Sequence, residues 1–436
     1  MKRGITKLGI FPFVFSIGSI AFAAPAQAQP VSRPGAEYQT IAEDGAWCWF
    51  ADPRAAHQQG TLSRTYIGFV NRSGDIKIIA HDTATKQVES YTLRKGLNKD
   101  DHASPALLVR LDGRLQVFYS AHGGRKMFYR ISENPEDISS WGREQELKSN
   151  TPGDYGYTYP NPIQLSGEAG KIYLFWRGGN FKPTFATSEK GRSWSEAQTL
   201  IQGPGARPYV KVVSNGTDTI HFAFTDGHPR VEKNNSIYYL RYHDGAFTKA
   251  NGERIKKIES LPLAPMEAKK IYDAKSHGAK AWIWDIALNE DEQPVIVYAT
   301  FPKKTDHRYR YARYNGSEWI DNDIVAAGGY FPQTPAGKVE TEPNYSGGVV
   351  LDHNDPSVVY LSRRVKAVFE IERWKTDDGG RTWKSQPITT ASTKNNLRPV
   401  VVRDHVPGGI RLVWMYGDYI HYTNYSTSLK VLLNEQ

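Results

Sequence analysis

The chain has 436 residues, with 55 Lys and Arg against 46 Asp and Glu, so its formal net charge is +9. Apolar residues make up 39% and aromatic residues 12%, which excludes a disordered chain and allows a large buried core. The single cysteine, Cys48, excludes an internal disulfide framework and any Cys-x-x-Cys metal or redox site.

The first 28 residues have the pattern of a secretory signal peptide. Basic residues precede an apolar stretch from Leu8 to Ala24, and small residues follow up to Ala28. We expect cleavage after Ala28, which leaves residues 29–436 as one secreted or periplasmic domain with a net charge of 9 − 3 = +6. No later stretch is apolar over the length that a membrane helix needs, so no membrane span is expected. The positive charge suits an anionic partner, and nucleic acid is not expected because no dense Lys/Arg run is present.

The rest of the chain is dominated by short strand-like segments. Runs such as Thr65–Val70, Ile220–Phe224 and Ile410–Met415 are rich in β-branched and aromatic residues, and clusters of Gly, Asn, Asp or Pro separate them. About two dozen such strands are expected. Helical periodicity is weak and is confined to the segment around Pro265–Lys270. The sequence therefore predicts an all-β protein.

A repeated motif indicates how so many strands are organised. The pattern Thr-x-acid-x-Gly-x-Ser/Thr-Trp occurs at 187–194 and 376–383, and the segment 315–319 is a degenerate third copy. The acid can accept backbone N–H groups, Gly permits a positive φ, and Trp anchors the turn in the core. The motif resembles the Asp-box, or BNR, turn of sialidase-like propellers. About 400 residues divided by roughly 50–60 per four-stranded blade predicts a single seven-bladed β-propeller with antiparallel blades.

Two pairs of polar residues lie at the ends of predicted hairpins. His102 precedes one strand and His122 ends the next, so a hairpin would bring both imidazoles to one face. Tyr159 and Arg177 have the same relation in the next predicted blade. An Arg between Phe-Trp and Gly-Gly is better placed on a rim facing an anion than in a core. The alternatives are a pair of structural histidines and an Arg stacked on Trp176.

A third group contains Tyr209 and His228. Tyr209 follows Arg-Pro and, taken alone, is typical of a core aromatic, whereas His228 lies between Gly and Pro in a loop. With Trp47–Arg54, the His pair, the Tyr-Pro-Asn-Pro block and the Arg-Gly-Gly block, the chain resembles the seven-bladed propeller polysaccharide lyases, with ulvan lyases as the nearest members. The resemblance covers nearly the whole predicted domain.

The resemblance implies a role for each of these residues. His102 and Tyr159 match the base and acid pair, while His122 and Arg177 match the residues that neutralise the substrate carboxylate. Tyr209 and His228 match further residues of the cleft. The implied reaction is β-elimination on a uronate-containing, sulfated polysaccharide, which leaves a 4,5-unsaturated uronate. Either neutral His102 removes the C5 proton and Tyr159 acts as the acid, or Tyr159 does both.

Other interpretations stay open at this stage. Relatives of this fold include rhamnose–glucuronate lyases and α-L-rhamnosidases, and in a hydrolase of this kind His57 would be the candidate catalytic residue. A glycan-binding propeller without catalysis is the third alternative. No cofactor is expected to be required for catalysis. Some related lyases carry a structural zinc ion, whose ligands the sequence does not identify, and Cys48 is expected to be buried packing. The oligomeric state is not determined, and a monomer is compatible with the sequence.

Overall fold

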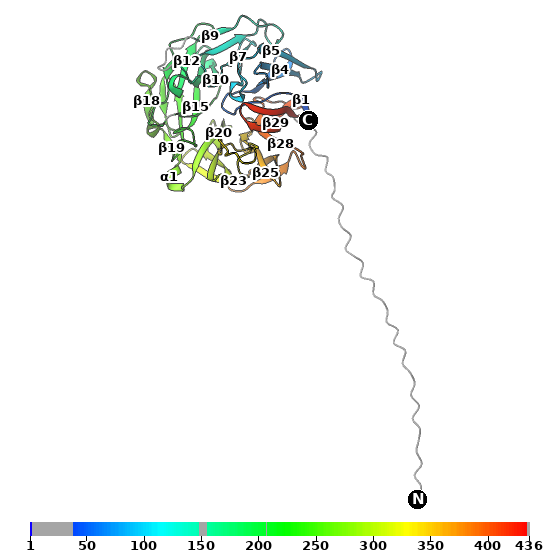
Figure 1. Cartoon of the computed structure of the whole chain (residues 1–436). Coiled ribbons are helices and arrows are strands. Elements are labelled where there is room, and N and C mark those ends of the chain that lie inside the picture. Colours follow the sequence, from blue (N-terminus) through cyan, green and yellow to red (C-terminus); the bar gives the residue numbers. More distant parts are fainter. Residues whose placement is uncertain (2–37, 148–154, 206, 434–436) are drawn as a thin grey trace. The chain divides into compact units, whose positions relative to one another are not determined.

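The computed structural model describes residue 1 and the ranges 38–147, 155–205 and 207–433. The predicted signal peptide lies outside these residues except for Met1. Within the compact unit 35–436, seven antiparallel sheets surround a central axis (Figure 1). The first strands of successive sheets contact one another, so they line the axis. The seven-bladed, all-β prediction is confirmed.

The first three sheets follow one another along the chain. The first contains β2 (Ala55–Gln59), β3 (Ser63–Val70), β4 (Ile76–Asp82) and β5 (Val88–Arg94). The second contains β6 (Ala106–Val109), β7 (Leu115–Tyr119), β8 (Met127–Ile131) and β9 (Gln145–Leu147). The third contains β10 (Thr158–Leu165), β11 (Lys171–Arg177), β12 (Pro183–Ser188) and β13 (Gln198–Thr199).

The fourth sheet is larger than predicted and has six strands. It contains β14 (Val210–Ser214), β15 (Thr219–Thr225), β16 (Ile237–His243), β17 (Ala246–Thr248), β18 (Arg254–Lys257) and β19 (Lys269–Tyr272). The weak helical signal at 265–270 corresponds to a short 3-10 turn, η5 (Pro265–Glu267), followed by β19. That strand pairs with the first part of β16, Ile237–Tyr239, which extends beyond the residues that pair with β17.

The last three sheets complete the ring. The fifth contains β20 (Lys280–Leu288), β21 (Pro294–Lys303), β22 (Asp306–Tyr314) and β23 (Trp319–Gly328). The sixth contains β24 (Val349–Leu351), β25 (Val358–Val365), β26 (Val368–Lys375) and β27 (Lys384–Pro387). The seventh contains β28 (Asn395–Val401), β29 (Ile410–His421), β30 (Asn424–Leu433) and, as its outer strand, β1 (Tyr38–Ala42) from the start of the described chain.

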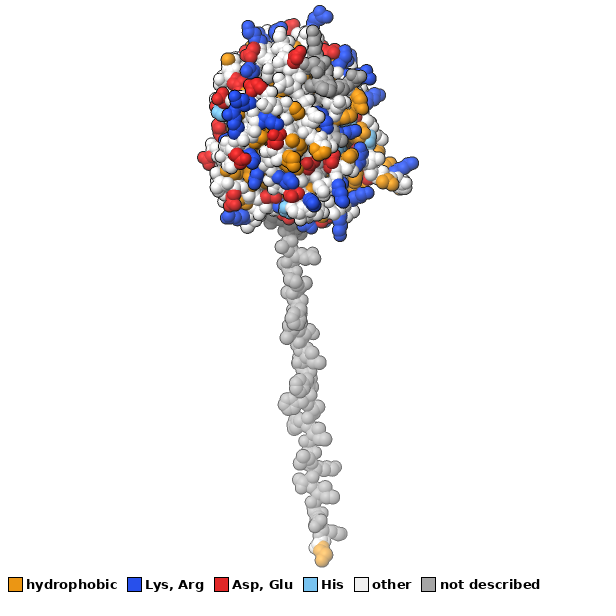
Figure 2. All heavy atoms as spheres, turned by 90° about the vertical axis from the view of Figure 1, so that its left-hand side faces the viewer, with side chains coloured by type: hydrophobic (Ala, Val, Ile, Leu, Met, Phe, Trp, Pro, Cys, Tyr) orange, Lys and Arg blue, Asp and Glu red, His pale blue; other side chains and the backbone are white. Residues whose placement is uncertain are grey.

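The few helical segments are short connections. They are α1 (Ala274–His277), η1 (Asp101–Ala103), η2 (Ser166–Glu168), η3 (Gly179–Phe181) and η4 (Ile258–Ser260), in addition to η5. The structure contains no helix, among its described residues, that is long and apolar enough to cross a membrane. Basic and acidic side chains are interspersed over the outer face on the β18 side of the propeller (Figure 2).

The repeated motif forms the turn before the outermost strand of a blade. In the 376–383 copy, Asp378 accepts hydrogen bonds from the backbone N–H groups of Arg381 and Thr382, and Gly380 has a φ of 92°. Trp383 then packs edge-on against Tyr311 of the preceding blade, with ring centroids 5.2 Å apart. The turn therefore joins neighbouring blades as well as ending a hairpin.

The degenerate copy at 315–319 is built in the same way. Asn315 accepts from the backbone of Ser317 and Glu318, and Trp319 packs on Tyr239 of the preceding blade with ring centroids 5.0 Å apart. An amide oxygen can replace the carboxylate here because the turn needs only a hydrogen-bond acceptor.

The segment between β1 and β2, residues 46–54, is buried at the centre of the ring of blades. The indole of Trp47 donates to the Arg398 carbonyl of the seventh blade, and the indole of Trp49 donates to the Ile283 carbonyl of the fifth. Trp49 also stacks on Trp284, with ring centroids 4.3 Å apart. We call this segment the central plug. It contacts several blades at once, and it provides the floor of the site described next.

Candidate active site

Six sequence-predicted residues form one continuous cluster above the central plug. His102 and His122 stack with ring centroids 4.0 Å apart, and His102 lies 5.8 Å from the ring of Tyr159. Tyr159 is 5.8 Å from Tyr209, and Tyr209 is 5.7 Å from His228. Arg177 is the sixth member, with its guanidinium 4.6 Å from the Tyr159 ring centre.

Hairpin geometry brings these residues together. His102 lies in η1, immediately before β6, and His122 follows β7, its antiparallel partner. Thr158, at the start of β10, pairs directly with Arg177 at the end of β11, which places Tyr159 beside the guanidinium. Each pair therefore meets at the same end of its blade, as the sequence spacing predicted.

Phe50 of the central plug supports the cluster from below. Its ring lies 4.6 Å from that of Tyr209 and 5.4 Å from that of Tyr159. Tyr159 has a φ of 62°, a left-handed conformation that is unfavourable for an aromatic residue and is typical of functional sites. The plug and the bulge between Thr158 and Asn161 hold Tyr159 in this conformation.

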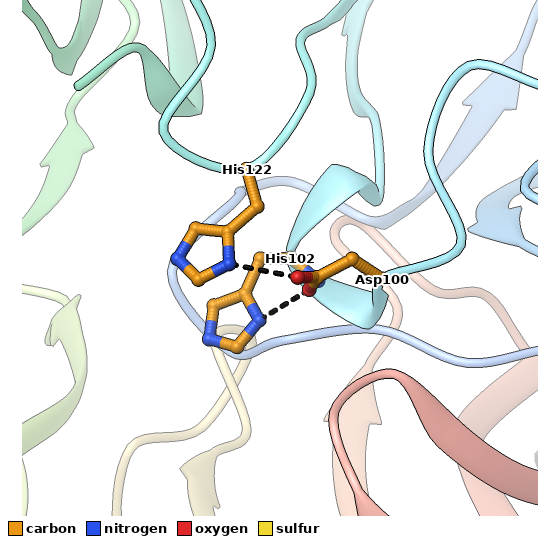
Figure 3. Close-up of side chains that lie close together, drawn as sticks. All are labelled: Asp100, His102 and His122. Carbon is orange, nitrogen blue, oxygen red and sulfur yellow. Dashed lines mark hydrogen bonds and ion pairs between the residues drawn. The ribbon is translucent and has the colours of Figure 1, made fainter. Parts of the chain in front are cut away.

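Asp100 joins the two histidines and was not assigned a role from the sequence. One of its carboxylate oxygens is 2.7 Å from Nδ1 of His102 and the other is 2.8 Å from Nδ1 of His122 (Figure 3). Both Nδ1 atoms thus carry hydrogen and donate to the carboxylate, so each ring directs Nε2 away from Asp100. The sequence signal was present, because Asp100 stands only two residues before His102.

The two histidines differ in their remaining contacts. His102 is almost fully buried, its Nδ1 also lies 2.9 Å from Asp101, and its Nε2 is 3.1 Å from the Tyr345 hydroxyl. His122 is partly exposed, and its Nε2 has no hydrogen-bond partner among the described residues. Only His122 therefore has a ring nitrogen available to a ligand.

These contacts shift the pKa values of the two histidines in opposite directions. Burial alone would lower the pKa of His102, but the polar groups around the ring, of which the Asp100 carboxylate is ionised at neutral pH, outweigh it, so the pKa is raised well above its ordinary value. Burial and the nearby charge on His102 lower the pKa of His122 to about 4. At neutral pH His102 is cationic and His122 neutral. A neutral His102 was considered as the base in the sequence analysis.

Arg177 is not on a rim, as the sequence analysis expected, but is 4% exposed. It donates to the Gly156 carbonyl at 3.0 Å, to the Thr158 hydroxyl at 2.9 Å and to the Tyr209 hydroxyl at 3.3 Å. None of these partners is a carboxylate, and no carboxylate forms an ion pair with Arg177 in the described part of the chain. Its charge therefore remains available to an anionic ligand.

Tyr159 is the candidate proton donor. Burial raises the pKa of its phenol well above the ordinary value, although the charge on His102 opposes this, so the hydroxyl keeps its proton at neutral pH. Within the described residues the Tyr159 hydroxyl makes no hydrogen bond, in contrast to that of Tyr345, which pairs with His102. Tyr209 and His228 complete one wall of the cluster. Burial lowers the pKa of His228 well below its ordinary value, which leaves it neutral.

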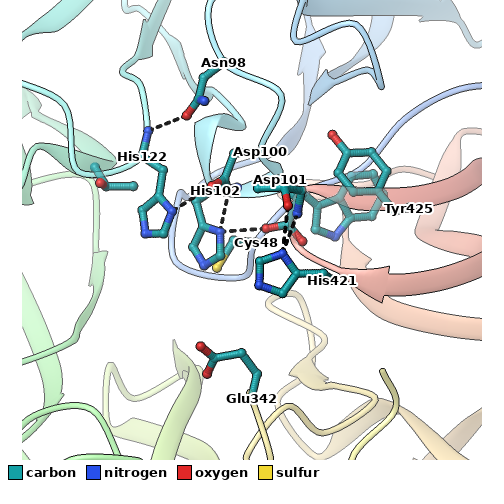
Figure 4. Close-up of polar contacts among 12 residues, drawn as sticks. Cys48, Asn98, Asp100, Asp101, His102, His122, Glu342, His421 and Tyr425 are labelled. Carbon is teal, nitrogen blue, oxygen red and sulfur yellow. Dashed lines mark hydrogen bonds and ion pairs between the residues drawn. The ribbon is translucent and has the colours of Figure 1, made fainter. Parts of the chain in front are cut away.

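Glu342 faces the histidines from the opposite side (Figure 4). Its carboxylate pairs with Arg230 at 2.6 Å and lies 3.5 Å from Nε2 of His228. Burial raises the pKa of this carboxyl, while Arg230 counteracts the shift. Sequence reasoning missed Glu342 and Tyr345 because a long connection between β23 and β24 carries them, without a motif of their own.

His57, the candidate for a hydrolase, lies outside this cluster. It is in β2 and lines a separate cavity with Gln164 and Ser214, which are at the C-terminal ends of the innermost strands. Its Nδ1 is 3.1 Å from the Thr65 hydroxyl and its Nε2 is 3.3 Å from the Ser63 hydroxyl. Both nitrogens are thus engaged within the blade.

The structural zinc ion that some related lyases carry would not find four ligands in the cluster. Asp100, His102 and His122 have ligand atoms within 4.8 Å of one another and are the one such group among the described residues. A structural zinc site uses four ligands, and here the two Nδ1 atoms already pair with the Asp100 carboxylate. Cys48 is buried in the hydrophobic core, as expected for a packing residue.

The comparisons with known proteins agree with this architecture. The chain is 22% identical over 329 residues to Ulvan Lyase-PL25 of Pseudoalteromonas sp. (strain PLSV), and the match covers 63% of each chain, just under two thirds of the relative. It is 20% identical over 377 residues to an ulvan lyase of Nonlabens ulvanivorans, with 74% of each chain covered.

Solved structures show the same fold. A polysaccharide lyase PL25 ulvan lyase superposes with a TM-score of 0.69 at 17% identity, covering 91% of this chain and 96% of the other. The same enzyme has been solved bound to -[GlcA(1-4)Rha3S]-. The profile of the family described as BNR repeat-containing family member matches residues 64–327, more than half of the chain. Together with the repeated turns and the seven blades, this match shows that the chain belongs to the BNR repeat-containing family.

Proposed function

We propose that the protein is an exported polysaccharide lyase that cleaves a uronate-containing, sulfated polysaccharide of the ulvan type by β-elimination. The observation that carries the proposal is the charge of Arg177, which has no carboxylate partner among the described residues, beside the Tyr159 ring and the two histidines with their different contacts. The ulvan lyases among its relatives and the glycan-bound structure support the same substrate class.

The reaction needs the negative charge of the uronate carboxylate to be offset. The C5–H bond is weakly acidic because the adjacent carboxylate is already negative, and a positive charge beside that carboxylate stabilises the enolate-like transition state. Arg177 can bind a carboxylate, and protonated His102 adds a second positive charge nearby. A binding protein without catalysis would not need a proton donor and acceptor beside this site.

The proton transfers then fall to His122 and Tyr159. Neutral His122 takes the C5 proton through Nε2, the C–H electrons form the C4–C5 double bond, and the C4–O bond breaks. The departing oxygen receives the proton of the Tyr159 phenol. This assignment exchanges the roles that the resemblance implies for His102 and His122, because His102 has both ring nitrogens engaged. Tyr209 and His228 shape the wall of the sugar site.

The direct test is the ultraviolet absorbance of the 4,5-unsaturated product during incubation of the purified protein with ulvan. We expect a steady rise for the wild type. Tyr159→Phe removes the proton donor and keeps the ring, so the rate should fall by about 10²–10⁴-fold. Absence of any rise over a range of pH values and uronate glycans would reject β-elimination.

Export is proposed from the N-terminal pattern alone. Expression of the full-length gene in a bacterium should release a protein that begins at Gln29, as read by N-terminal sequencing. Retention of Met1 on the exported protein would contradict cleavage after Ala28.

A further inference from the structure

A basic groove adjoins the active site between the fourth and fifth blades. The loops after β15 and β19, the β21–β22 hairpin and the loop before β24 line it. Six of its fifteen lining residues are cationic and none is acidic. The six are Arg230, Lys233, Lys275, Lys280, Lys303 and Lys304.

The charge composition of this groove differs from that of the chain as a whole. The whole chain has 55 basic and 46 acidic residues, nearly equal numbers, whereas the lining has six cationic residues and no acidic one. Elsewhere on the surface the two signs are interspersed, as Figure 2 shows for the β18 side. A concave surface lined by one sign of charge concentrates the potential and attracts the opposite charge.

Two of the cations have structural partners. Arg230 pairs with Glu342, and the Lys280 amine donates to the Pro229 carbonyl at 2.7 Å. The amines of the other four lysines form no ion pair or hydrogen bond within the described part of the chain. Lys303 and Lys304 are both exposed at the β21–β22 hairpin. Their charges are therefore available to a ligand.

Residues of the groove lie next to active-site residues at three points. Pro229 of its lining follows His228, and Arg230 joins the groove to Glu342. Asn344 of the lining precedes Tyr345, whose hydroxyl contacts His102. A polymer that places one sugar against Arg177 and leaves the cluster past His228 would therefore enter this groove.

We propose that the basic groove binds sulfate groups on the sugars next to the cleavage site, and that it sets a preference for sulfated chains. The proposal rests on the proposed lyase function. Exposed lysines suit sulfate esters because a compact ammonium group can approach a tetrahedral anion from many directions. The groove thus supplies affinity for substrate, while the cluster around Tyr159 performs the chemistry.

The test compares two double variants with the same change in charge. Lys303→Gln/Lys304→Gln removes two groove charges, and Lys190→Gln/Lys257→Gln removes two exposed charges outside the groove lining. On ulvan at low salt, we expect the groove variant to raise KM roughly threefold to tenfold with kcat within about twofold, and added salt to reduce the difference. The control variant should match the wild type.

Chemically modified substrates show whether the groove binds the sulfate groups or the carboxylates of the polysaccharide. With desulfated ulvan the groove variant and the control should behave alike, whereas with carboxyl-reduced ulvan the difference in binding should persist. Equal KM values for both variants on native ulvan would overturn the proposal. A difference that disappears on carboxyl reduction and survives desulfation would overturn the assignment to sulfate.

Binding is also measured without turnover, by affinity electrophoresis of each variant combined with Tyr159→Phe in gels containing ulvan. This separates the two proposals. If the wild type cleaves no uronate glycan, the lyase function fails, and retardation of the control but not of the groove variant still supports the groove. If the wild type cleaves ulvan and both variants are equally retarded, only the groove proposal fails.

Discussion

At the scale of single residues, Asp100 gives two adjacent imidazoles different tasks. It accepts from both Nδ1 atoms, but His102 has a second carboxylate, Asp101, and a hydroxyl on its other nitrogen. Arg398 in turn pairs with Asp101 inside the core, which holds that carboxylate in its charged form. A protonated His102 disfavours a second charge on the stacked ring of His122. The pair therefore supplies one cation and one base.

This difference predicts the pH dependence of the reaction. The pKa of His122 is lowered to about 4, so its neutral, basic form is populated above that pH and is lost as the pH falls through it. The raised pKa of His102 keeps the cation until the pH rises well above 6.5. We expect kcat/KM for ulvan to be flat across neutral pH, with its acidic limb near pH 4. An acidic limb near 6.5 would contradict the assignment of His122 as the base.

Substitution of His122 tests its role as the base independently of His102. His122→Gln removes the proton acceptor, and we expect kcat to fall by about 10²–10⁴-fold with a smaller change in KM. Because His122 is partly exposed, the thermal midpoint of unfolding should change little. A variant that retains nearly full activity in the absorbance assay would return the base role to His102 or Tyr159.

Metal removal provides an independent check on the cluster. The Nδ1 atoms of both histidines already pair with Asp100, so the proposed chemistry requires no metal ion. Dialysis against a chelator should leave the initial rate on ulvan unchanged, with the protein checked for residual zinc by elemental analysis. A loss of activity that zinc restores would contradict this prediction.

At the scale of elements, the central plug determines the shape of the site. It crosses the channel that the innermost strands surround and places Phe50 beneath Tyr159 and Tyr209. Buried ions also fix the plug, because Asp52 pairs with Arg54 at 2.9 Å and contacts the amine of Lys211 from β14. The ion pairs that fix the plug therefore also fix Phe50, on which the ring of the proton donor Tyr159 packs.

Trp49 is the residue of the plug whose loss should be most costly. It is 2% exposed and packs on Trp282 and Trp284. Trp49→Ala should lower the free energy of unfolding by about 3–5 kcal/mol, measured by denaturant titration. Trp319→Ala, at a half-buried turn between blades, is the matched comparison and should cost less. Equal losses would mean that the plug does not stabilise the channel as described.

At the scale of the whole molecule, the ring is closed by strands from both ends of the described chain. β1 pairs with β30, so the seventh blade contains its outer strand only because the chain returns to its beginning. Tyr38 packs edge-on against Trp414 with ring centroids 5.3 Å apart, which adds an apolar contact to the closure. Closure hides the edge of β30, which would otherwise be free to pair with another chain.

Removal of β1 should therefore weaken the propeller. A chain that starts at residue 43 is expected to unfold at a lower temperature and to aggregate more readily than one that starts at residue 36, because the edge of β30 is exposed. Differential scanning calorimetry and light scattering measure the two effects. Identical thermal midpoints for both chains would show that β1 does not contribute to closure.

The sequence by itself determined the local structure of the protein. Strand segments, the turn motif and the meeting of His102 with His122 and of Tyr159 with Arg177 follow from interactions between residues close in the chain. These are set by side-chain alternation, turn chemistry and hairpin length, which act over about twenty residues.

Only the tertiary structure decided the charge and burial of the site. The Nε2 atom of His102 is engaged by Tyr345, which is 243 residues away from it in sequence. Arg177 was expected on a rim, but packing against Tyr159 and Tyr209 buries it. Likewise, the basic groove gathers lysines from separate blades. Electrostatic effects and burial depend on distance in space, and ring closure brings together residues that no local pattern connects.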